Sequence, residues 1–159
     1  MGFWDKVKAV KNMVTGGAAT VYVEVQEAKL GEPFKVVVKA NVKDQDLSIN
    51  GVYLKVRGME KVTVPNVRVP ADVDFDGDFE IVGTDLHRSA VTNEFEQNIN
   101  GPQELEANQE YVWEAEITLP QGALPSYRGF NAAHEWEIFA GLDARGNDPD
   151  SDWVDFVAY

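Results

Sequence analysis

Apolar and polar residues alternate with a period of two along most of this chain. The pattern is clearest in four stretches, which are residues 21–26, 34–42, 52–57 and 111–119. Side chains of a β-strand point to opposite faces in turn, so the alternation describes strands with one buried and one solvated face. Turn-forming residues separate the stretches, and no repeat of about 33 to 45 residues is present. The sequence therefore predicts an all-β fold, a two-sheet antiparallel β-sandwich.

Two of the alternating runs flank a loop that carries proline at both ends, between residues 113 and 143. The first run ends at Leu119-Pro120, and the second begins near Glu135. We expect two antiparallel strands joined at a corner. Residues 62–64 predict a short edge strand, because prolines follow it at positions 65 and 70. The acidic region 71–103 shows only intermittent strand character.

Residues 3–14 have a helical period instead. Their apolar residues recur at spacings of four, three and four, and glycines at positions 16 and 17 end the pattern. We expect an amphipathic N-terminal helix over residues 1–17, followed by the sandwich over residues 18–159. The helix has two interpretations. It docks on the sandwich, or it contacts a membrane surface or a partner through Phe3 and Trp4, with its lysines facing anionic lipid.

Length and charge exclude several classes of function. The 159 residues are sufficient for one domain. Lys and Arg number 14 and Asp and Glu 27, a net charge of −13, which disfavours nucleic-acid binding. With no cysteine, disulfides, thiolate zinc sites and cysteine nucleophiles are excluded. No apolar run is long enough to span a membrane, and no secretory signal precedes the strands, so we expect a cytoplasmic protein.

The polar residues do not form a recognisable catalytic motif. His134-Glu135 begins like a zinc-protease motif, but position 138 is Ile, and on a strand the two side chains would face opposite ways. Glu114 and Glu116 share one strand face about 6.6 Å apart, where we expect a solvated surface. We therefore expect no enzymatic activity, no catalytic residue and no cofactor.

Two acidic runs allow a calcium hypothesis. Positions 1, 3 and 5 of a calcium-binding loop match the first run, but Gly83 stands where the bidentate glutamate is expected. The alternative is ordinary solvated loop charge, and we assign no metal ligand. If calcium binds, the function would be that of a calcium-stabilised ligand-binding or adhesion module. The residues concerned are Asp72, Asp74 and Asp76 in the first run, and Asp148, Asp150 and Asp152 in the second.

Three segments carry a resemblance to a known family. They are Leu-Gly-Glu-Pro at residues 30–33, the strand ending in glycine at residues 49–58, and the proline-bounded segment 119–129 followed by the strand with Trp136, Ile138 and Ala140. The chain resembles the arrestin-like superfamily, and most closely its bacterial branch, the sporulation-control family. The likeness covers residues 1–64 and 104–159. This chain has length for a single arrestin-like domain, whereas eukaryotic arrestins have two in tandem.

The resemblance implies a function as well as a fold. It implies a non-enzymatic adaptor or regulatory protein that works in the cytoplasm by binding another protein. We expect the contact surfaces to be an unpaired sheet edge and the N-terminal helix. Homo-oligomerisation through the sheet edge and peripheral membrane contact through the helix are two further expectations. The resemblance does not identify the partner or any site residue.

Overall fold

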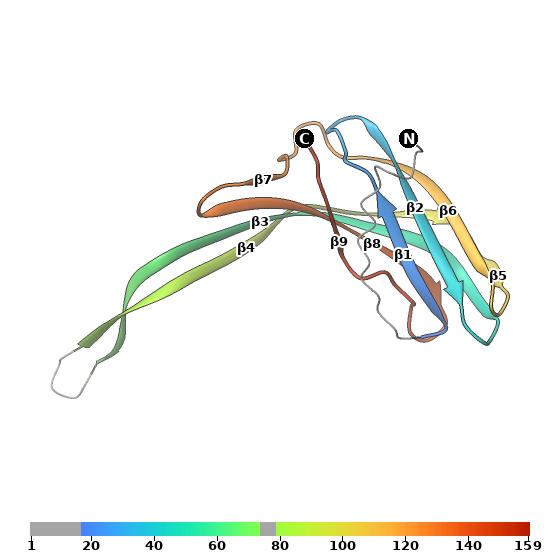
Figure 1. Cartoon of the computed structure of the whole chain (residues 1–159), viewed down its shortest axis with the longest axis horizontal. Helices are drawn as coiled ribbons and strands as arrows, with labels where there is room; N and C mark the ends of the chain where they lie inside the picture. The colour runs from blue at the N-terminus through green and yellow to red at the C-terminus, as the bar shows by residue number, and fades with distance from the viewer. Residues whose placement is uncertain (1–16, 74–78) are drawn as a thin grey trace, which may run out of the picture.

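The computed structural model describes residues 17–73 and 79–159, and the side chains outside 71–80. Two antiparallel sheets pack against each other, which confirms the predicted all-β sandwich (Figure 1). The smaller sheet has the order β1 (Ala19–Val25), β2 (Pro33–Val42), β6 (Glu110–Thr118). The predicted helix at residues 1–17 falls almost wholly outside the described residues, so its two interpretations stay predictions.

The larger sheet is built around one long strand. Its order is β4 (Phe79–Asn100), β3 (Leu47–Val73), β8 (Ala132–Ala144), β7 (Tyr127–Arg128). Two short strands complete it, because β5 (Gln103–Leu105) pairs with β3 and β9 (Val154–Phe156) pairs with β8. The strands predicted on either side of the proline-bounded loop are β6 and β8, and they lie in opposite sheets. The loop between them is therefore the corner at which the chain changes sheets.

The core lies between the sheets and follows the alternation seen in the sequence. Every second residue of β1 and β2 is buried, as are inward residues of β3 and β8. Trp136 is the largest fully buried side chain, and its indole Nε1 donates to the carbonyl of Leu124 at 2.9 Å. This bond ties the corner loop to the centre of the core. Members of the core cluster on the two long strands of the larger sheet include Val52, Leu54, Val56, Ile138 and Ala140.

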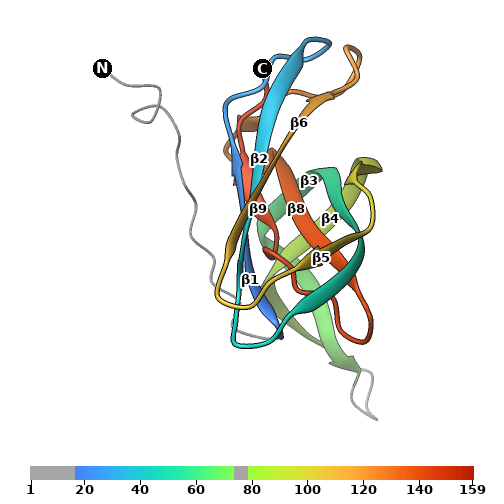
Figure 2. The same ribbon diagram turned by 90° about the vertical axis from the view of Figure 1, so that its right-hand side faces the viewer.

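β3 and β4 are longer than the sandwich that they help to build. β8 pairs with β3 only between Ile49 and Val62, whereas β4 pairs with β3 as far as Val73. Beyond Val62 the two strands continue alone and project from the sandwich (Figures 1 and 2). We call residues 63–73 and 79–87 the ribbon. Eleven residues of β3 in this part span about 35 Å at a rise of about 3.3 Å each.

The predicted end of the strand after residue 64 is wrong, because β3 passes through both prolines. A register shift between Val64 and Val67 contains Pro65, whereas Pro70 stays in register opposite Ile81, next to a second shift. At the first shift Asn66 adopts a φ of 58°, and its N–H donates to Asp85 Oδ1 at 3.1 Å. A bulge leaves its extra residues out of the ladder, so Pro65 removes no interstrand hydrogen bond. Intermittent strand character was predicted for region 71–103, but its residues 79–100 form the single continuous strand β4.

Candidate protein-interaction surface

The inner face of the larger sheet continues onto the ribbon. Val62 and Val64 lie on the same side of β3 as the buried Val56, because these positions differ by even numbers within an unbroken register. On β4, positions 86, 84 and 82 pair with Val64, Val67 and Val69 and lie on the same side of the two strands. We call this side of the ribbon and its base the apolar face. Its members are Val62, Val64, Val67, Val69, Val82 and Leu86.

The apolar face is not covered by any described part of the chain. Val56 is fully buried, but farther out on the same strand and face Val64 is 37% exposed. On β4, Val82 is 37% exposed and Leu86 48%. The smaller sheet that covers Val56 does not reach these residues, since the ribbon lies outside the sandwich (Figure 1). The sheet face that is buried inside the sandwich is therefore exposed to solvent where it continues on the ribbon.

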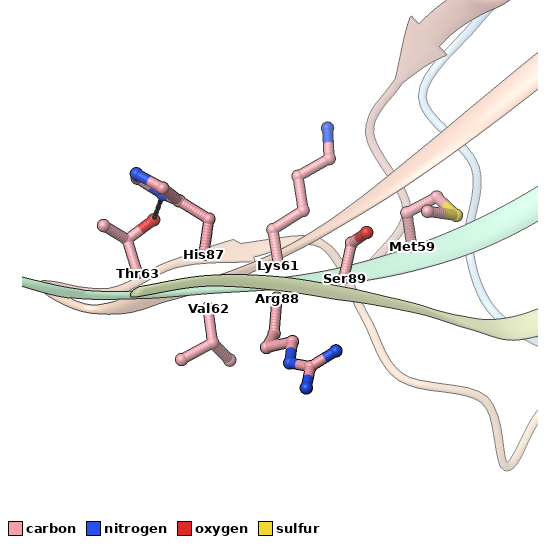
Figure 3. Close-up of a pocket in the computed structure, with 7 residues that line it drawn as sticks. All are labelled: Met59, Lys61, Val62, Thr63, His87, Arg88 and Ser89. Carbon is pink, nitrogen blue, oxygen red and sulfur yellow. Dashed lines mark hydrogen bonds between the residues drawn. The ribbon is translucent and has the colours of Figure 1, made fainter. Parts of the chain in front are cut away.

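The base of the ribbon separates polar from apolar side chains. Figure 3 shows Lys61, Thr63 and His87 on one side of the two strands, with Val62 and Arg88 on the other. Thr63 Oγ1 and His87 Nδ1 are 3.1 Å apart across the strands. These polar groups line a shallow hollow on the side opposite the apolar face. The ribbon is therefore amphipathic, and only one of its sides resembles a protein core.

An aromatic side chain stands beside this base. The turn between β7 and β8 closes with a bond from Gly129 N to the carbonyl of Ala132, and the carbonyl of Asn131 accepts from Thr63 N. These bonds attach the turn to β3 where the ribbon begins. Phe130, in the same turn, is 97% exposed. Exposed aromatic residues next to an apolar face are typical anchors of protein interfaces.

The two edges of the ribbon differ in their ability to pair with another strand. β4 is the end strand of its sheet, and its outer edge pairs with no strand among residues 17–73 and 79–159. Its 22 residues include neither proline nor lysine. Pro65 and Pro70 interrupt the free edge of β3, because proline has no N–H to donate. The edge of β4 is thus the one that can accept another strand.

A cluster of charges lies on the opposite, outer face of the larger sheet. Carboxylate oxygens of Glu135, Glu137 and Asp155 lie within 4.8 Å of one another. Arg57 Nε donates to Glu137 Oε2 at 2.6 Å, and Glu135 pairs with Lys61 and with Arg128. The hydrogen bond from Lys61 is the main reason that the pKa of Glu135 is lowered. The cluster is thus largely neutralised by its own cations.

Asp155 is the exception in this cluster. Desolvation by burial raises the pKa of its carboxyl, and the negative charges of Glu137 and Glu135 raise it further. The nearby cations oppose these effects and are the smaller influence. Ionisation of Asp155 is therefore less favourable in the folded protein than in the unfolded chain.

The predicted separation of His134 and Glu135 is confirmed. His134 is fully buried, whereas Glu135 lies on the outer face with its cations. The Nδ1 atom of His134 lies 3.1 Å from the carbonyl of Pro125, and its Nε2 lies 2.7 Å from Thr92 Oγ1. A carbonyl can only accept, so in the neutral ring Nδ1 donates and Nε2 accepts from the Thr92 hydroxyl. The histidine joins β8, β4 and the corner loop.

The other acidic residues named as candidates do not come together in a common site among the described side chains. Glu114 and Glu116 are exposed on the outer face of the smaller sheet, as expected, and Glu114 pairs with Lys35 at 2.7 Å. The carboxylates of the second acidic run do not form a cluster of possible metal ligands in the described part of the chain. Side chains of the first run, Asp72, Asp74 and Asp76, lie outside the described residues, so that calcium hypothesis stays a prediction.

Each carboxylate of the second run bonds to groups of the protein instead. Asp148 Oδ1 accepts from Ala144 N at 3.1 Å, and its Oδ2 accepts from the Tyr53 hydroxyl at 3.2 Å. Burial, followed by the charge of Asp148, raises the pKa of Tyr53 to about 12. Asp150 and Asp152 accept backbone N–H groups within residues 150–153. These aspartates therefore shape the loop before β9.

Sequence reasoning did not identify the ribbon or Phe130 as candidate interaction residues. One signal for the ribbon was available, because valines at positions 62, 64, 67 and 69 continue the alternation past the first proline with a single phase shift. No sequence signal marked Phe130, since a single aromatic residue in a loop belongs to no periodic pattern.

Comparison with solved structures identifies a shared fold. The structure of Spo0M, a sporulation control protein from Bacillus subtilis, matches with a TM-score of 0.57 and 18% sequence identity. The match covers 90% of this chain and 50% of Spo0M, so the chain spans about half the length of that protein. No family model matches the sequence, and no curated protein matches it. Among the described residues, no helix has the length and apolar character needed to cross a membrane.

Proposed function

We propose that this chain is a non-enzymatic regulatory protein that acts by binding another protein in the cytoplasm. Two observations support the proposal. The fold is shared with a sporulation control protein, and the sequence segments described above resemble the arrestin-like superfamily and its sporulation-control branch. The observation that carries it is the ribbon, which projects from the sandwich with a free strand edge and exposed apolar side chains.

The free edge of β4 supplies the mechanism of this proposal. An extended segment of a partner would add to β4 as a further strand and use its unpaired N–H and C=O groups. Main-chain bonds of this kind provide affinity, and contacts of side chains on alternate positions provide specificity. Phe130 beside the base would anchor the partner through burial of its ring.

The test removes the ribbon and keeps the sandwich. Residues 64–86 are replaced by Asn-Gly, which joins the opposite residues Thr63 and His87 by a two-residue hairpin turn. We expect the shortened chain to fold, because none of the described side chains among the removed residues belongs to the buried core. Tagged chains would be used to capture partners, with and without a calcium chelator. The proposal predicts partners that bind the full chain and not the shortened chain, without any need for calcium.

A matched control leaves the ribbon intact. Glu116→Gln removes one exposed charge from the outer face of the smaller sheet, whereas the ribbon extends from the larger sheet. We expect it to retain the same partners as the unaltered chain. If the shortened chain also retained them, the ribbon would not be the binding element. Capture that required calcium would favour the ligand-binding or adhesion alternative.

A further inference from the structure

The two sides of the sandwich differ in how the sheets are joined. On one side the chain after β1 bonds to the chain after β9, because Ala28 N donates to Val157 O at 2.8 Å and Tyr159 N donates to Ala28 O at 3.0 Å. On the other side the sheets end at β4 and β6, and neither outer edge pairs with a strand in the described part of the chain. We call this side the open side. A weak bond of 3.5 Å from Gln97 Nε2 to Glu116 O crosses it.

The core is incompletely covered along the open side. Phe95 and Ile99 of β4 and Ala115 of β6 pack against the core cluster but are only partly buried. The clearest case is Gln97, which pairs with Leu54 on the same face of the larger sheet. Leu54 is 1% exposed, whereas Gln97 is exposed although its side chain points toward the smaller sheet. Apolar side chains added beside β4 would therefore extend the core.

The other face of β4 is acidic along the same stretch. Residues 93–98 pair with β3 in unbroken register, between two register shifts. Glu94 and Glu96 point to the outer face of the larger sheet, and both are exposed. Lys55 Nζ lies 3.7 Å from Glu96 Oε2, but Glu94 forms no ion pair with another described side chain. The edge of β4 is thus bordered by apolar groups on one face and by negative charge on the other.

We propose that the open side binds an extended segment of a partner protein in which basic and apolar residues alternate. The segment adds to β4 beside residues 93–98 through main-chain hydrogen bonds. Side chains of a strand alternate between its two faces, so the apolar residues pack beside Phe95 and the basic residues lie beside Glu94 and Glu96. This inference rests on the strand addition to β4 proposed above. It adds the chemistry of the bound segment, on a part of the edge that the shortened chain keeps.

Charge complementarity selects a basic segment over other occupants. An acidic segment would place its carboxylates next to Glu94 and Glu96, and like charges opposite each other are destabilising. A second copy of this chain fits less well for the same reason, because pairing of two β4 edges brings the glutamates of both chains together. The edge of β6 is less suited, since Lys35 of the neighbouring strand already pairs with Glu114 at 2.7 Å. The net charge of −13 also favours a basic partner.

The first test uses a synthetic probe of the predicted chemistry. A labelled peptide of alternating valine and lysine, about as long as residues 93–98, is titrated with the full chain, and a peptide of alternating valine and glutamate is the control. Fluorescence anisotropy should give the lysine peptide a dissociation constant at least about tenfold lower. Glu94→Lys combined with Glu96→Lys should reverse the preference. Glu114→Lys combined with Glu116→Lys makes the same change of charge on β6 and should keep it.

The second test examines the main-chain hydrogen bonds. Successive N–H groups of a strand point to opposite edges, so the valines of the peptide donate at one edge and the lysines at the other. N-methylation of all valines removes the donors of one edge, and N-methylation of all lysines removes those of the other. A segment that adds to β4 uses one edge, so one methylated peptide should bind and the other should not. Equal affinities of the two peptides would refute strand addition.

The shortened chain without residues 64–86 separates this inference from the proposed function. It keeps residues 93–98, so it should bind the lysine peptide as tightly as the full chain does. Failure of the peptide to bind either chain would overturn the inference and leave capture of partners by the ribbon unaffected. Binding to the full chain alone would move the site to the ribbon, and a reversed preference in the variant of Glu114 and Glu116 would move it to β6. Binding that appears only when residues 1–15 are removed would assign the edge to that segment of the same chain.

Discussion

At the scale of single residues, the packing around His134 is tight. Gly58 of β3 lies directly beneath it, and a Cβ built at this glycine would be 2.6 Å from Thr92 Oγ1 and 2.9 Å from His134 Nε2. Both atoms belong to the hydrogen bond between Thr92 and the histidine. The absence of a side chain at position 58 therefore permits a buried polar link between β4 and β8.

Gly58→Ala should separate that pair. We expect the free energy of unfolding to fall by about 1–3 kcal/mol, because the added methyl group must displace a buried, hydrogen-bonded ring. Urea denaturation would measure the loss. Gly122→Ala is the matched control, since a Cβ at Gly122 meets no atom within 4 Å, and its effect should stay within about 0.5 kcal/mol. Equal stability of the two variants would show that the packing around His134 is loose.

Asp155 gives a prediction that depends on pH. Its pKa is raised in the folded state by burial and by Glu137 and Glu135, so the charged form opposes folding. This penalty is complete above the raised pKa and disappears as the pH falls through it. Asp155→Asn should therefore be more stable than the unaltered chain near neutral pH, by less than about 1 kcal/mol given the solvent around the group. The difference should shrink on acidification.

Urea denaturation at several pH values tests this expectation. Glu116→Gln serves as the control, because Glu116 is exposed on the other sheet and its substitution should have a small effect on stability. A stability gain from Asp155→Asn that stayed constant down to strongly acidic conditions would contradict the assigned cause, since the carboxyl would then be neutral in both states.

At the scale of elements, β3 combines two roles along one face. Its inner residues up to Val56 build the core, and those from Val64 outward belong to the apolar face. Val56→Ala should lower the free energy of unfolding by about 2 kcal/mol through lost burial and a cavity. Val64→Ala should cost less than about 0.5 kcal/mol in the monomer, because its side chain is partly solvated already.

Thermal or urea unfolding of both variants measures the two losses. Similar losses for the two substitutions would mean that the ribbon is already covered within one chain.

Most of the sandwich could be predicted from the sequence because alternation is a local property. β1, β2 and β6 appeared as alternating runs, and their buried faces are those that the pattern indicated. The ribbon could not be predicted in the same way. Val62 and Val64 show the same alternation as Val56, and the pattern does not state how far the opposite sheet extends. The prolines at positions 65 and 70 predicted that the strand would end after residue 64, and the bulge at Asn66 shifts the phase of the alternation beyond it.

At the scale of the whole molecule, net charge opposes contact with acidic partners. Two bodies with a charge of −13 each, separated by about 35 Å, would repel by on the order of 20 kcal/mol without salt. A few surface ion pairs contribute only about 0.2–1 kcal/mol each. At physiological ionic strength the Debye length is about 8 Å, and the long-range repulsion falls below about 1 kcal/mol.

Capture of an acidic partner by the full chain should therefore improve as salt rises from about 10 mM to about 150 mM, because screening removes this repulsion. The amount of partner captured across that range of salt would measure the effect. Capture that weakened steadily as salt rose would show that local ion pairs outweigh the net charge.

The described side chains of the hairpin 64–86 lie outside the buried core, which has a consequence for protein engineering. Exchange of this hairpin should leave the interior of the sandwich intact, so it can be transplanted as a unit. Grafted between two adjacent antiparallel strands of an unrelated β-protein, the hairpin should allow that protein to bind the same partner. Conversely, hairpins of new sequence inserted between Thr63 and His87 should change which partner this chain binds.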